Sequence, residues 1–255
     1  MGQLDGKVAL VTGSAHSIGK AIAIGLAREG ANMVLADRDI PAMQVTEKTI
    51  KDIGVQVEAV PTDVTDEKQI DALFARLMGS FGRLDILVNN AGLFYASPIE
   101  DMTTEGWDKL IATSLRGPFL CTRAAFRIMK KQKDGRIINI GSISAQRVRL
   151  NNAAYSAAKF GLVGLTHTTA LEGRQYGINC GILHPGNVRQ DRMPPAGTPP
   201  ARPANAPERE AMTPDAMMTP DEIAATAVYM ACLPRHINIL ELVQLPREQI
   251  FLGRG

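Results

Sequence analysis

The stretch KVALVTGSAHSIG, residues 7–19, carries the pattern on which the interpretation of the fold rests. The strand-forming residues VALVT run into a glycine-containing turn, and an apolar helix pattern follows at once. Glycines let a backbone approach a pyrophosphate, and the N-terminus of a helix stabilises negative charge, so this arrangement is typical of a dinucleotide site. Gly13 and Gly19 fill the first and last glycine positions of such a loop, whereas Ser17 stands where a further glycine is usual.

The rest of the chain repeats the alternation of apolar strand and amphipathic helix. Further strand patterns are MVLAD, VQVEAV, LDILVN, RIINIGS, INCGILH and INILELVQL, and helix patterns cover Ile18–Glu29, Ile40–Ile53, Asp66–Phe81, Thr104–Lys131, Ala153–Tyr176 and Asp221–Cys232. The strand patterns lack polar alternation, which indicates strands buried on both faces of a parallel sheet. We therefore expect an α/β fold: a doubly wound, Rossmann-type parallel sheet of about seven strands, with helices on both faces, in a single domain over residues 1–255.

One segment, residues 189–220, interrupts this alternation. It contains MPPAGTPPARPANAP, is rich in proline and alanine, and shows no apolar periodicity. It is too long for an ordinary connection, so we expect either a substrate lid or a disordered insert within the domain.

Composition and charge restrict the classes of function. The 255 residues are 45% hydrophobic and 21% charged, which is typical of a globular protein with a full core. A net charge of +2 provides no basic stripe for nucleic acid, and no apolar run is long enough for a membrane span or a signal peptide. The three cysteines and four histidines form no metal-binding motif. We expect a cytoplasmic protein with no metal site, no nucleic-acid partner and no membrane association.

Asp37 ends the second strand pattern, 18 residues after Gly19. This is close to the spacing of about 20 residues at which an acidic side chain binds the ribose hydroxyls of NAD. The carboxylate would repel the 2′-phosphate of NADP, although Arg38 and His16 could offset part of that repulsion. We expect NAD as the cofactor and NADP as the less favoured one. In the alternative interpretation the glycines form only a tight turn, and Asp37 caps the next helix.

Four further motifs follow in order: NNAG at residues 89–92, Ser142 within NIGSISA, YSAAK at residues 155–159, and HPGNV at residues 184–188. With the glycine loop at residues 12–19, they make the chain resemble the short-chain dehydrogenase/reductase family over nearly its whole length. The resemblance implies an enzyme that moves a hydride between NAD(H) and a secondary alcohol or ketone. It also implies a homotetramer or a homodimer.

The YSAAK motif has a chemical rationale of its own. Tyr155 and Lys159 are four residues apart, so on a helix their side chains share one face. A free tyrosine has a pKa of about 10, and a nearby ammonium group or a positively charged nicotinamide lowers it. Tyr155 is then a general base toward an alcohol, or the acid in the reverse direction. The resemblance adds that Lys159 holds the nicotinamide ribose and that Ser142 hydrogen-bonds the reacting oxygen. Alternatively, Tyr155 only packs and Lys159 is solvated.

The resemblance also assigns a cofactor-binding set. Asp63 and Val64 match the pair that receives the adenine, although Asp63 could instead cap the next helix. Asn90 matches a residue on the adenosine side, although it could instead tie strand ends together. The full expected set is Gly13, Ser17, Ile18, Gly19, Asp37, Asp63, Val64, Asn90, Gly92, Tyr155, Lys159, Pro185, Gly186 and Val188.

Three positions depart from the family pattern: Ser17, Ser114 and Gln190. We expect Ser17 still to bind phosphate, with its hydroxyl as an added donor. Ser114 replaces an asparagine that joins a proton relay in the family, and we expect it to be a fourth catalytic residue with a weakened relay. Gln190 replaces a threonine near the carboxamide of the nicotinamide.

The substrate is the least defined part of the interpretation. The residues expected to face it include Phe94, Tyr95, Ser144, Gln146, Arg147, Arg149, Asn152, His184, Asn187 and Arg189. Two alternative functions stay open: an NADP-preferring ketone reductase of the 3-oxoacyl type, and a non-catalytic dinucleotide-binding or sensor protein.

Overall fold

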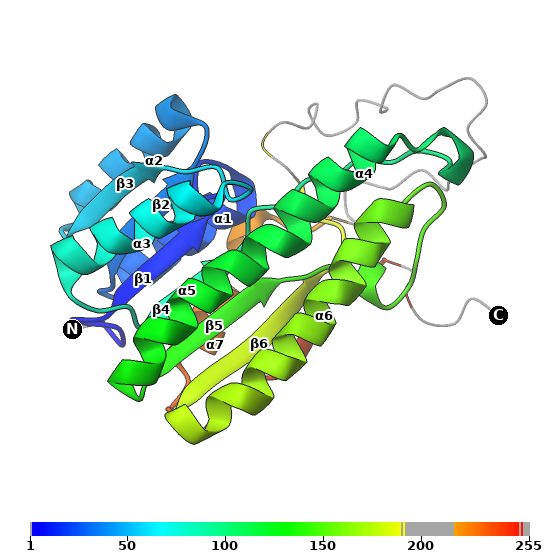
Figure 1. Cartoon of the computed structure of the whole chain (residues 1–255). Coiled ribbons are helices and arrows are strands. Elements are labelled where there is room, and N and C mark those ends of the chain that lie inside the picture. Colours follow the sequence, from blue (N-terminus) through cyan, green and yellow to red (C-terminus); the bar gives the residue numbers. More distant parts are fainter. Residues whose placement is uncertain (1, 190, 192–216, 250, 252–255) are drawn as a thin grey trace.

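Seven parallel strands form one sheet in this computed structural model, which describes residues 2–189, 191, 217–249 and 251. The strand order is β3-β2-β1-β4-β5-β6-β7 (Figure 1). The strands are β1 (Val8–Thr12), β2 (Asn32–Asp37), β3 (Val57–Pro61), β4 (Ile86–Asn89), β5 (Gly135–Ile140), β6 (Ile178–Pro185) and β7 (Glu241–Gln244). Every neighbouring pair is parallel, so the predicted doubly wound α/β fold is confirmed.

Helices cover both faces of this sheet. One face carries α1 (Ser17–Arg28), α2 (Ile40–Ile53) and α7 (Pro220–Cys232); the other carries α3 (Glu67–Phe81), α5 (Gly117–Gln132) and α6 (Ala153–Gly173), with α4 (Thr104–Ile111) packed on α6 (Figure 1). Short 3₁₀ turns occur at Ile99–Asp101, Ile143–Ala145 and Arg174–Tyr176. Successive side chains of a strand point to opposite faces, so in β1 Ala9 and Val11 pack on the α1 side and Leu10 on the α3 side.

The helix caps of α2 and α3 exclude the alternative roles of Asp37 and Asp63 as caps. The side chain of Asp39 caps α2 by accepting a hydrogen bond from the backbone N–H of Ala42. The side chain of Asp66 caps α3 in the same way. Asp37 and Asp63 are therefore not the helix caps, and the interpretation that gave them only that role is wrong.

The predicted continuous helix over Thr104–Lys131 is also wrong. A π-helical turn at Ala112–Arg116 separates α4 from α5, and the N–H of Gly117 bonds the carbonyl of Ala112, five residues back. Pro118 follows, and it lacks the N–H that an α-helix would donate to the carbonyl of Ser114. The local hydrogen-bond pattern therefore changes at the residue for which we predicted a catalytic role.

Two predicted elements are shorter than expected. The α-helix that begins at Ala153 ends at Gly173 and continues only as a 3₁₀ turn. The strand predicted in INILELVQL is confined to Glu241–Gln244.

The predicted lid or insert, residues 189–220, lies outside the described residues except for Arg189, Asp191 and residues 217–220, and Gln190 lies outside them too. The described ends of this segment are joined by a parallel bridge between Val188 and Met218.

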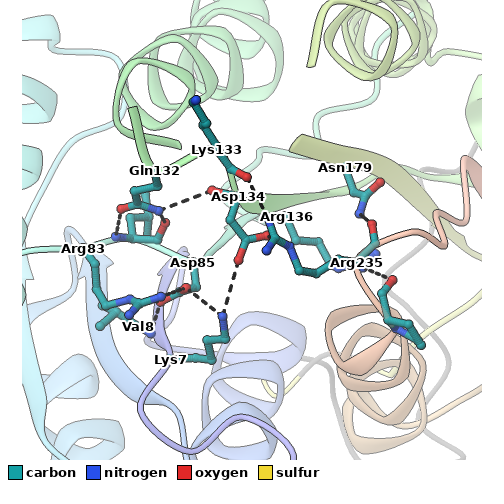
Figure 2. Close-up of polar contacts among 12 residues, drawn as sticks. Lys7, Val8, Arg83, Asp85, Gln132, Lys133, Asp134, Arg136, Asn179 and Arg235 are labelled. Atoms are coloured by element: carbon teal, nitrogen blue, oxygen red, sulfur yellow. Dashed lines mark hydrogen bonds and ion pairs between the residues drawn. The ribbon is translucent and has the colours of Figure 1, made fainter. Parts of the chain in front are cut away.

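A charged network closes the amino-terminal edge of the sheet (Figure 2). Asp85 is 4% exposed and precedes β4. Its carboxylate accepts hydrogen bonds from the backbone N–H of Val8 at 2.9 Å, from Lys7 at 3.2 Å, and from Arg83 at 2.8 and 2.6 Å. Burial raises the pKa of Asp85, but the hydrogen bonds from Arg83 and Val8 and the charge of Lys7 outweigh it and hold the pKa below its usual value. The network therefore links the first residues of β1 and β4.

The second part of the network anchors the chain after α7. Arg136, in β5, donates through Nη2 to the carbonyls of Leu233, Pro234 and Ile237. The opposite edge, where the parallel strands end, carries none of these contacts and is where the predicted site residues lie.

Candidate active site

The glycine loop between β1 and α1 has no room for side chains at its two glycines. Gly13 has φ 66°, and a Cβ there would lie 2.8 Å from Nδ2 of Asn90. A Cβ on Gly19 would lie 2.0 Å from the carbonyl oxygen of Gly13. The backbone is thus exposed as a cradle at the N-terminus of α1, which fits the pyrophosphate of a dinucleotide.

Asn90 ties the end of β4 to this loop. Its Nδ2 atom donates to the carbonyl oxygens of Thr12 and Gly13, each at 3.0 Å. The hydroxyl of Thr12 accepts in return from the N–H groups of Asn90 and Ala91, each at 3.1 Å. The tying role proposed as an alternative for Asn90 is therefore present, and it supports the cradle.

Ser17, the departure from the glycine pattern, has φ 48°, in the left-handed region that glycine adopts most readily. Its N–H donates to Oδ2 of Asp191 at 2.7 Å, and its hydroxyl accepts from the N–H of Asp191 at 3.2 Å. The hydroxyl accepts here and keeps its own hydrogen, so its role as a phosphate donor stays a prediction.

Asp37 lies at the end of β2 and faces the loop. One carboxylate oxygen accepts from the N–H of Ala15 at 3.0 Å and the other from the N–H of Asp39 at 3.0 Å. Both candidate cations of this region are beside carboxylates: His16 Nε2 is 2.8 Å from Asp39, and Arg38 Nη1 is 3.4 Å from Asp63. The region where the adenosine ribose is expected therefore holds three acidic side chains around two basic ones.

Asp63 and Val64 lie just beyond β3, next to this acidic group. Asp63 accepts from the N–H and the hydroxyl of Thr65. Burial raises the pKa of Asp63, and the hydrogen bonds from Thr65 and the charge of Arg38 outweigh it and lower the pKa. Val64 is buried against Gly117, where a Cβ would lie 2.9 Å from its side chain.

The three predicted catalytic residues come together at the ends of β5 and the start of α6. The side chain of Ser142 is close enough to Tyr155 to favour its ionised form. Lys159 lies one helical turn further, with Nζ 5.7 Å from the centroid of the Tyr155 ring and 2.8 Å from the carbonyl oxygen of Ile140. Ser142 also accepts from the N–H of Ser144 at 3.1 Å, which fixes its hydroxyl oxygen.

Burial dominates the ionisation of this group. Burial raises the pKa of Tyr155, and the hydrogen bond from Ser142 and the positive charge of Arg149 offset it only in part. Burial lowers the pKa of Lys159 to about 8. The pKa of Tyr155 is raised here because burial outweighs these favourable contacts, and its lowering by Lys159 together with a bound nicotinamide stays a prediction.

Ser114 lies in the π-helical turn, buried and directed at the chain after β4. Its hydroxyl accepts from the N–H of Leu93 at 3.0 Å and lies 3.4 Å from the carbonyl of the same residue. A Cβ on Gly92 would be 3.5 Å from Oγ of Ser114 and 4.0 Å from Nζ of Lys159. Ser114 thus lies near the lysine, as the proton-relay prediction requires, but its hydroxyl already binds the backbone.

The turn after β6 packs against the C-terminal segment. A Cβ on Gly186 would lie 2.2 Å from the side chain of Gln249, and the N–H of Asn187 donates to the same side-chain oxygen at 2.7 Å. Oδ1 of Asn187 accepts from Arg149 at 3.1 Å. Pro185 and Val188 are buried on either side of this turn.

Comparison with known proteins agrees with this geometry. A family model described as short chain dehydrogenase matches residues 7–198. The chain belongs to the short-chain dehydrogenase/reductase family.

Relatives of this short-chain dehydrogenase act on alcohols. The chain is 35% identical to D-beta-hydroxybutyrate dehydrogenase of Cupriavidus necator over 89% of its own length and 92% of the relative. It is 38% identical to sorbitol dehydrogenase of Cereibacter sphaeroides over 73% and 72%. A solved metagenomic short-chain oxidoreductase in complex with NADP is 31% identical, with a TM-score of 0.81 over 97% of this chain and 100% of that one. The protein is thus an oxidoreductase of this family.

The predicted substrate residues of this dehydrogenase fall into two groups. Tyr95, Gln146 and Arg147 are exposed on the loops that flank Tyr155. Ser144 is buried, and His184 is fully buried at 0% exposure, so His184 does not face the substrate region as predicted.

Sequence reasoning missed three contributors to the dehydrogenase site. Thr12 could have been found, since it directly precedes the first glycine of the loop. The cap formed by Asp39 could also have been found, because an acidic residue two positions before Pro41 is a helix-start signal. Asp191 carries no such signal, since its contact with Ser17 spans 174 residues.

In the part of the chain that the structure describes, no helix is both long enough and apolar enough to span a membrane.

Proposed function

We propose that this short-chain dehydrogenase transfers a hydride between NAD(H) and a secondary alcohol or ketone, with Tyr155 as the general acid and base. The observation that carries the proposal is that the Ser142 side chain and the buried Lys159 both lie close to Tyr155. The cofactor, when bound, accepts or supplies the hydride. Ser142 positions the substrate oxygen, and Tyr155 takes or returns its proton.

Lys159 has two roles in this proposal. Its ammonium group favours the phenolate of Tyr155 when it is charged, and it holds the nicotinamide ribose. A positively charged nicotinamide next to Tyr155 and Lys159 would favour the phenolate and so lower the pKa of the Tyr155 hydroxyl. We also propose that Ser114 acts through its backbone carbonyl, because its hydroxyl binds Leu93.

The preference for NAD rests on the charges around Asp37. A 2′-phosphate there would meet Asp37, Asp39 and Asp63, while Arg38 and His16 lie beside two of these carboxylates. The NADP in the solved relative belongs to that protein. We propose that NAD(H) binds at least about tenfold more tightly than NADP(H), the equivalent of about 1.4 kcal/mol.

The loops beside Tyr155 suggest the substrate class. The ring of Phe94 meets that of Tyr155 edge-on at a centroid distance of 5.2 Å. The exposed apolar side chains of the two loops are Phe94, Tyr95, Val148 and Leu150. A backbone bridge between Ser97 and Asn152 joins the loops. We propose a substrate with an apolar substituent next to the reacting carbon.

The test is turnover of 2-alkanols of increasing chain length with NAD and with NADP, and titration of both cofactors. Turnover efficiency that rises with chain length and a tighter NADH complex would support the proposal. Tyr155→Phe should abolish turnover and keep cofactor binding, whereas Tyr229→Phe, on the exposed side of α7, should change neither. Cofactor binding without turnover of any alcohol or ketone would favour the non-catalytic alternative, and equal affinities would exclude the NAD preference.

Two further properties remain proposals: a homotetramer or homodimer, by resemblance to the family, and a cytoplasmic location, from the composition.

A further inference from the structure

His184 lies at the end of β6, directly behind Ser142. Its side chain is 0% exposed. Nδ1 of the imidazole is 2.9 Å from the carbonyl oxygen of Ser142 and 3.3 Å from its backbone nitrogen. The ring thus contacts both backbone polar groups of the residue whose hydroxyl meets Tyr155.

Gly141 makes this approach possible. A Cβ at position 141 would lie 2.7 Å from Nδ1 of His184. Any side chain there would therefore push the imidazole away from Ser142. The glycine and the histidine form one local arrangement on neighbouring strands, in which the N–H of Gly141 donates to the carbonyl of Leu183 at 2.7 Å.

The other end of the imidazole faces an acidic side chain. Nε2 of His184 is 3.6 Å from Oε2 of Glu241, at the start of β7. Among the described residues, this buried nitrogen has no hydrogen-bond partner. The second oxygen of Glu241 is 2.6 Å from Nε2 of His167, on α6. Glu241 therefore stands between a buried histidine and a surface one.

Burial keeps the ring of His184 neutral near neutral pH. Burial lowers the pKa of His184, and the charge of Lys159 on α6 adds to this effect. The carbonyl of Ser142 and the carboxylate of Glu241 raise the pKa, but less. A neutral imidazole carries one proton, so only one of its ends can donate. Ser142 and Glu241 therefore compete for that proton.

We propose that His184 is a positioning residue that holds the backbone of Ser142, and that Glu241 selects which nitrogen of His184 carries the proton. This rests on the proposed function, in which Ser142 positions the substrate oxygen. A carboxylate near Nε2 favours a proton there, which leaves Nδ1 to accept from the N–H of Ser142. Without that charge, the proton moves to Nδ1 and donates to the carbonyl of Ser142.

The first experiment measures kinetics of three variants. His184→Leu keeps a buried apolar side chain but removes both contacts with Ser142, and we expect kcat to fall about 10- to 100-fold, because small displacements of a positioning group have effects of this size. KM for NAD should stay within about threefold, since the cofactor loop is untouched. His184→Gln, whose amide can donate or accept, should recover part of the loss. His236→Gln, exposed after α7, is the matched control and should leave kcat unchanged.

The second experiment reads the ring directly and needs no turnover. In protein labelled with ¹⁵N-histidine, the chemical shifts of the ring nitrogens report the tautomer of each of the four histidines. Glu241→Gln should shift His184 toward the Nδ1–H form and lower its pKa, while His236→Gln should do neither. An unchanged tautomer in Glu241→Gln overturns the role of Glu241.

The outcomes separate this inference from the function on which it rests. If the wild-type protein turns over alcohols and a folded His184→Leu variant has normal kcat, the positioning role is wrong. If that variant loses kcat only in proportion to a lost folded fraction, judged by cofactor binding and thermal unfolding, the role is structural and the inference is also wrong. If the wild-type protein turns over nothing, the proposed function fails, and the tautomer experiment still decides the link between His184 and Glu241.

Discussion

The Nζ atom of Lys159 donates a hydrogen bond to the carbonyl oxygen of Ile140 at 2.8 Å, so the buried lysine is fixed to the strand that ends beside Ser142. This contact orients the ammonium group before any cofactor binds. Burial nevertheless destabilises the charged form of this lysine and lowers the pKa of Lys159 to about 8.

Lys159→Met should therefore stabilise the cofactor-free protein while it abolishes turnover. At pH 7 the wild-type lysine is buried in its charged form, and replacing it removes a cost of about 1 kcal/mol or more, or a few degrees in Tm. The folded pKa lies below the unfolded value of about 10.4, so wild-type stability rises as the pH increases through this interval. The advantage of the variant should accordingly shrink between pH 7 and pH 10. Thermal unfolding across this range checks it, and a variant less stable than wild type at pH 7 would contradict it.

Asp39→Asn should weaken the discrimination against NADP. Asparagine keeps the cap of α2, because it accepts from the N–H of Ala42 as aspartate does. It removes one negative charge beside His16, and we expect NADP(H) to bind about three- to fivefold more tightly, the equivalent of about 1 kcal/mol or less. Asp52→Asn, at the other end of α2, is the control. Titration of both cofactors measures the effect, and unchanged NADP affinity would argue against a role of Asp39.

Substitutions of Ser114 should separate its hydroxyl from its carbonyl. Proton-transfer steps contribute a factor of at least about 10² to kcat. The hydroxyl of Ser114 binds the backbone of Leu93, so we expect Ser114→Ala to lower kcat by less than this factor. Ser114→Asn should keep or raise turnover, most visibly below neutral pH, where Tyr155 is harder to deprotonate. The pH profiles of kcat for wild type and both variants provide the measurement. A larger loss in Ser114→Ala would assign the relay to the hydroxyl.

Asp85→Asn should destabilise the fold by about 3 kcal/mol at neutral pH, because it leaves Arg83 and Lys7 without their buried partner. The folded pKa of Asp85 lies below its unfolded value of about 3.9, so its contribution is present above that value and is lost as the pH falls through the folded pKa. Urea unfolding at pH 7 and at pH 3 should show the difference between variant and wild type becoming smaller. Asp71→Asn, exposed on α3, is the control.

The strands and the glycine loop could be predicted because local residue patterns determine them. Apolar runs marked each of the seven strands, and Gly13 and Gly19 marked the places where a side chain would collide with the backbone. The spacing of Tyr155 and Lys159 likewise placed both at one site, although it could not show that burial would shift the pKa of each.

The features that could not be predicted depend on contacts between distant parts of the chain. Asp85 meets Lys7 across 78 residues, and His184 on β6 meets Glu241 on the neighbouring strand β7. No local pattern records such a pairing. The π-helical turn is a different case, because Pro118 inside the predicted helix was a usable signal that apolar periodicity outweighed.

The two hydrogen bonds between Ser17 and Asp191 compete with a cofactor phosphate for the N-terminus of α1. The carboxylate of Asp191 holds an N–H group at the N-terminus of α1, where a phosphate would be stabilised, and the chain keeps it there at a high effective concentration. A dinucleotide whose phosphate bound this N–H would have to displace Asp191, and its apparent dissociation constant would be multiplied by a constant factor. That factor is common to NAD and NADP, which share the same pyrophosphate. The ratio of the NAD and NADP affinities therefore reports only the charges around Asp37. Each affinity on its own also depends on the strength of the contact between Ser17 and Asp191.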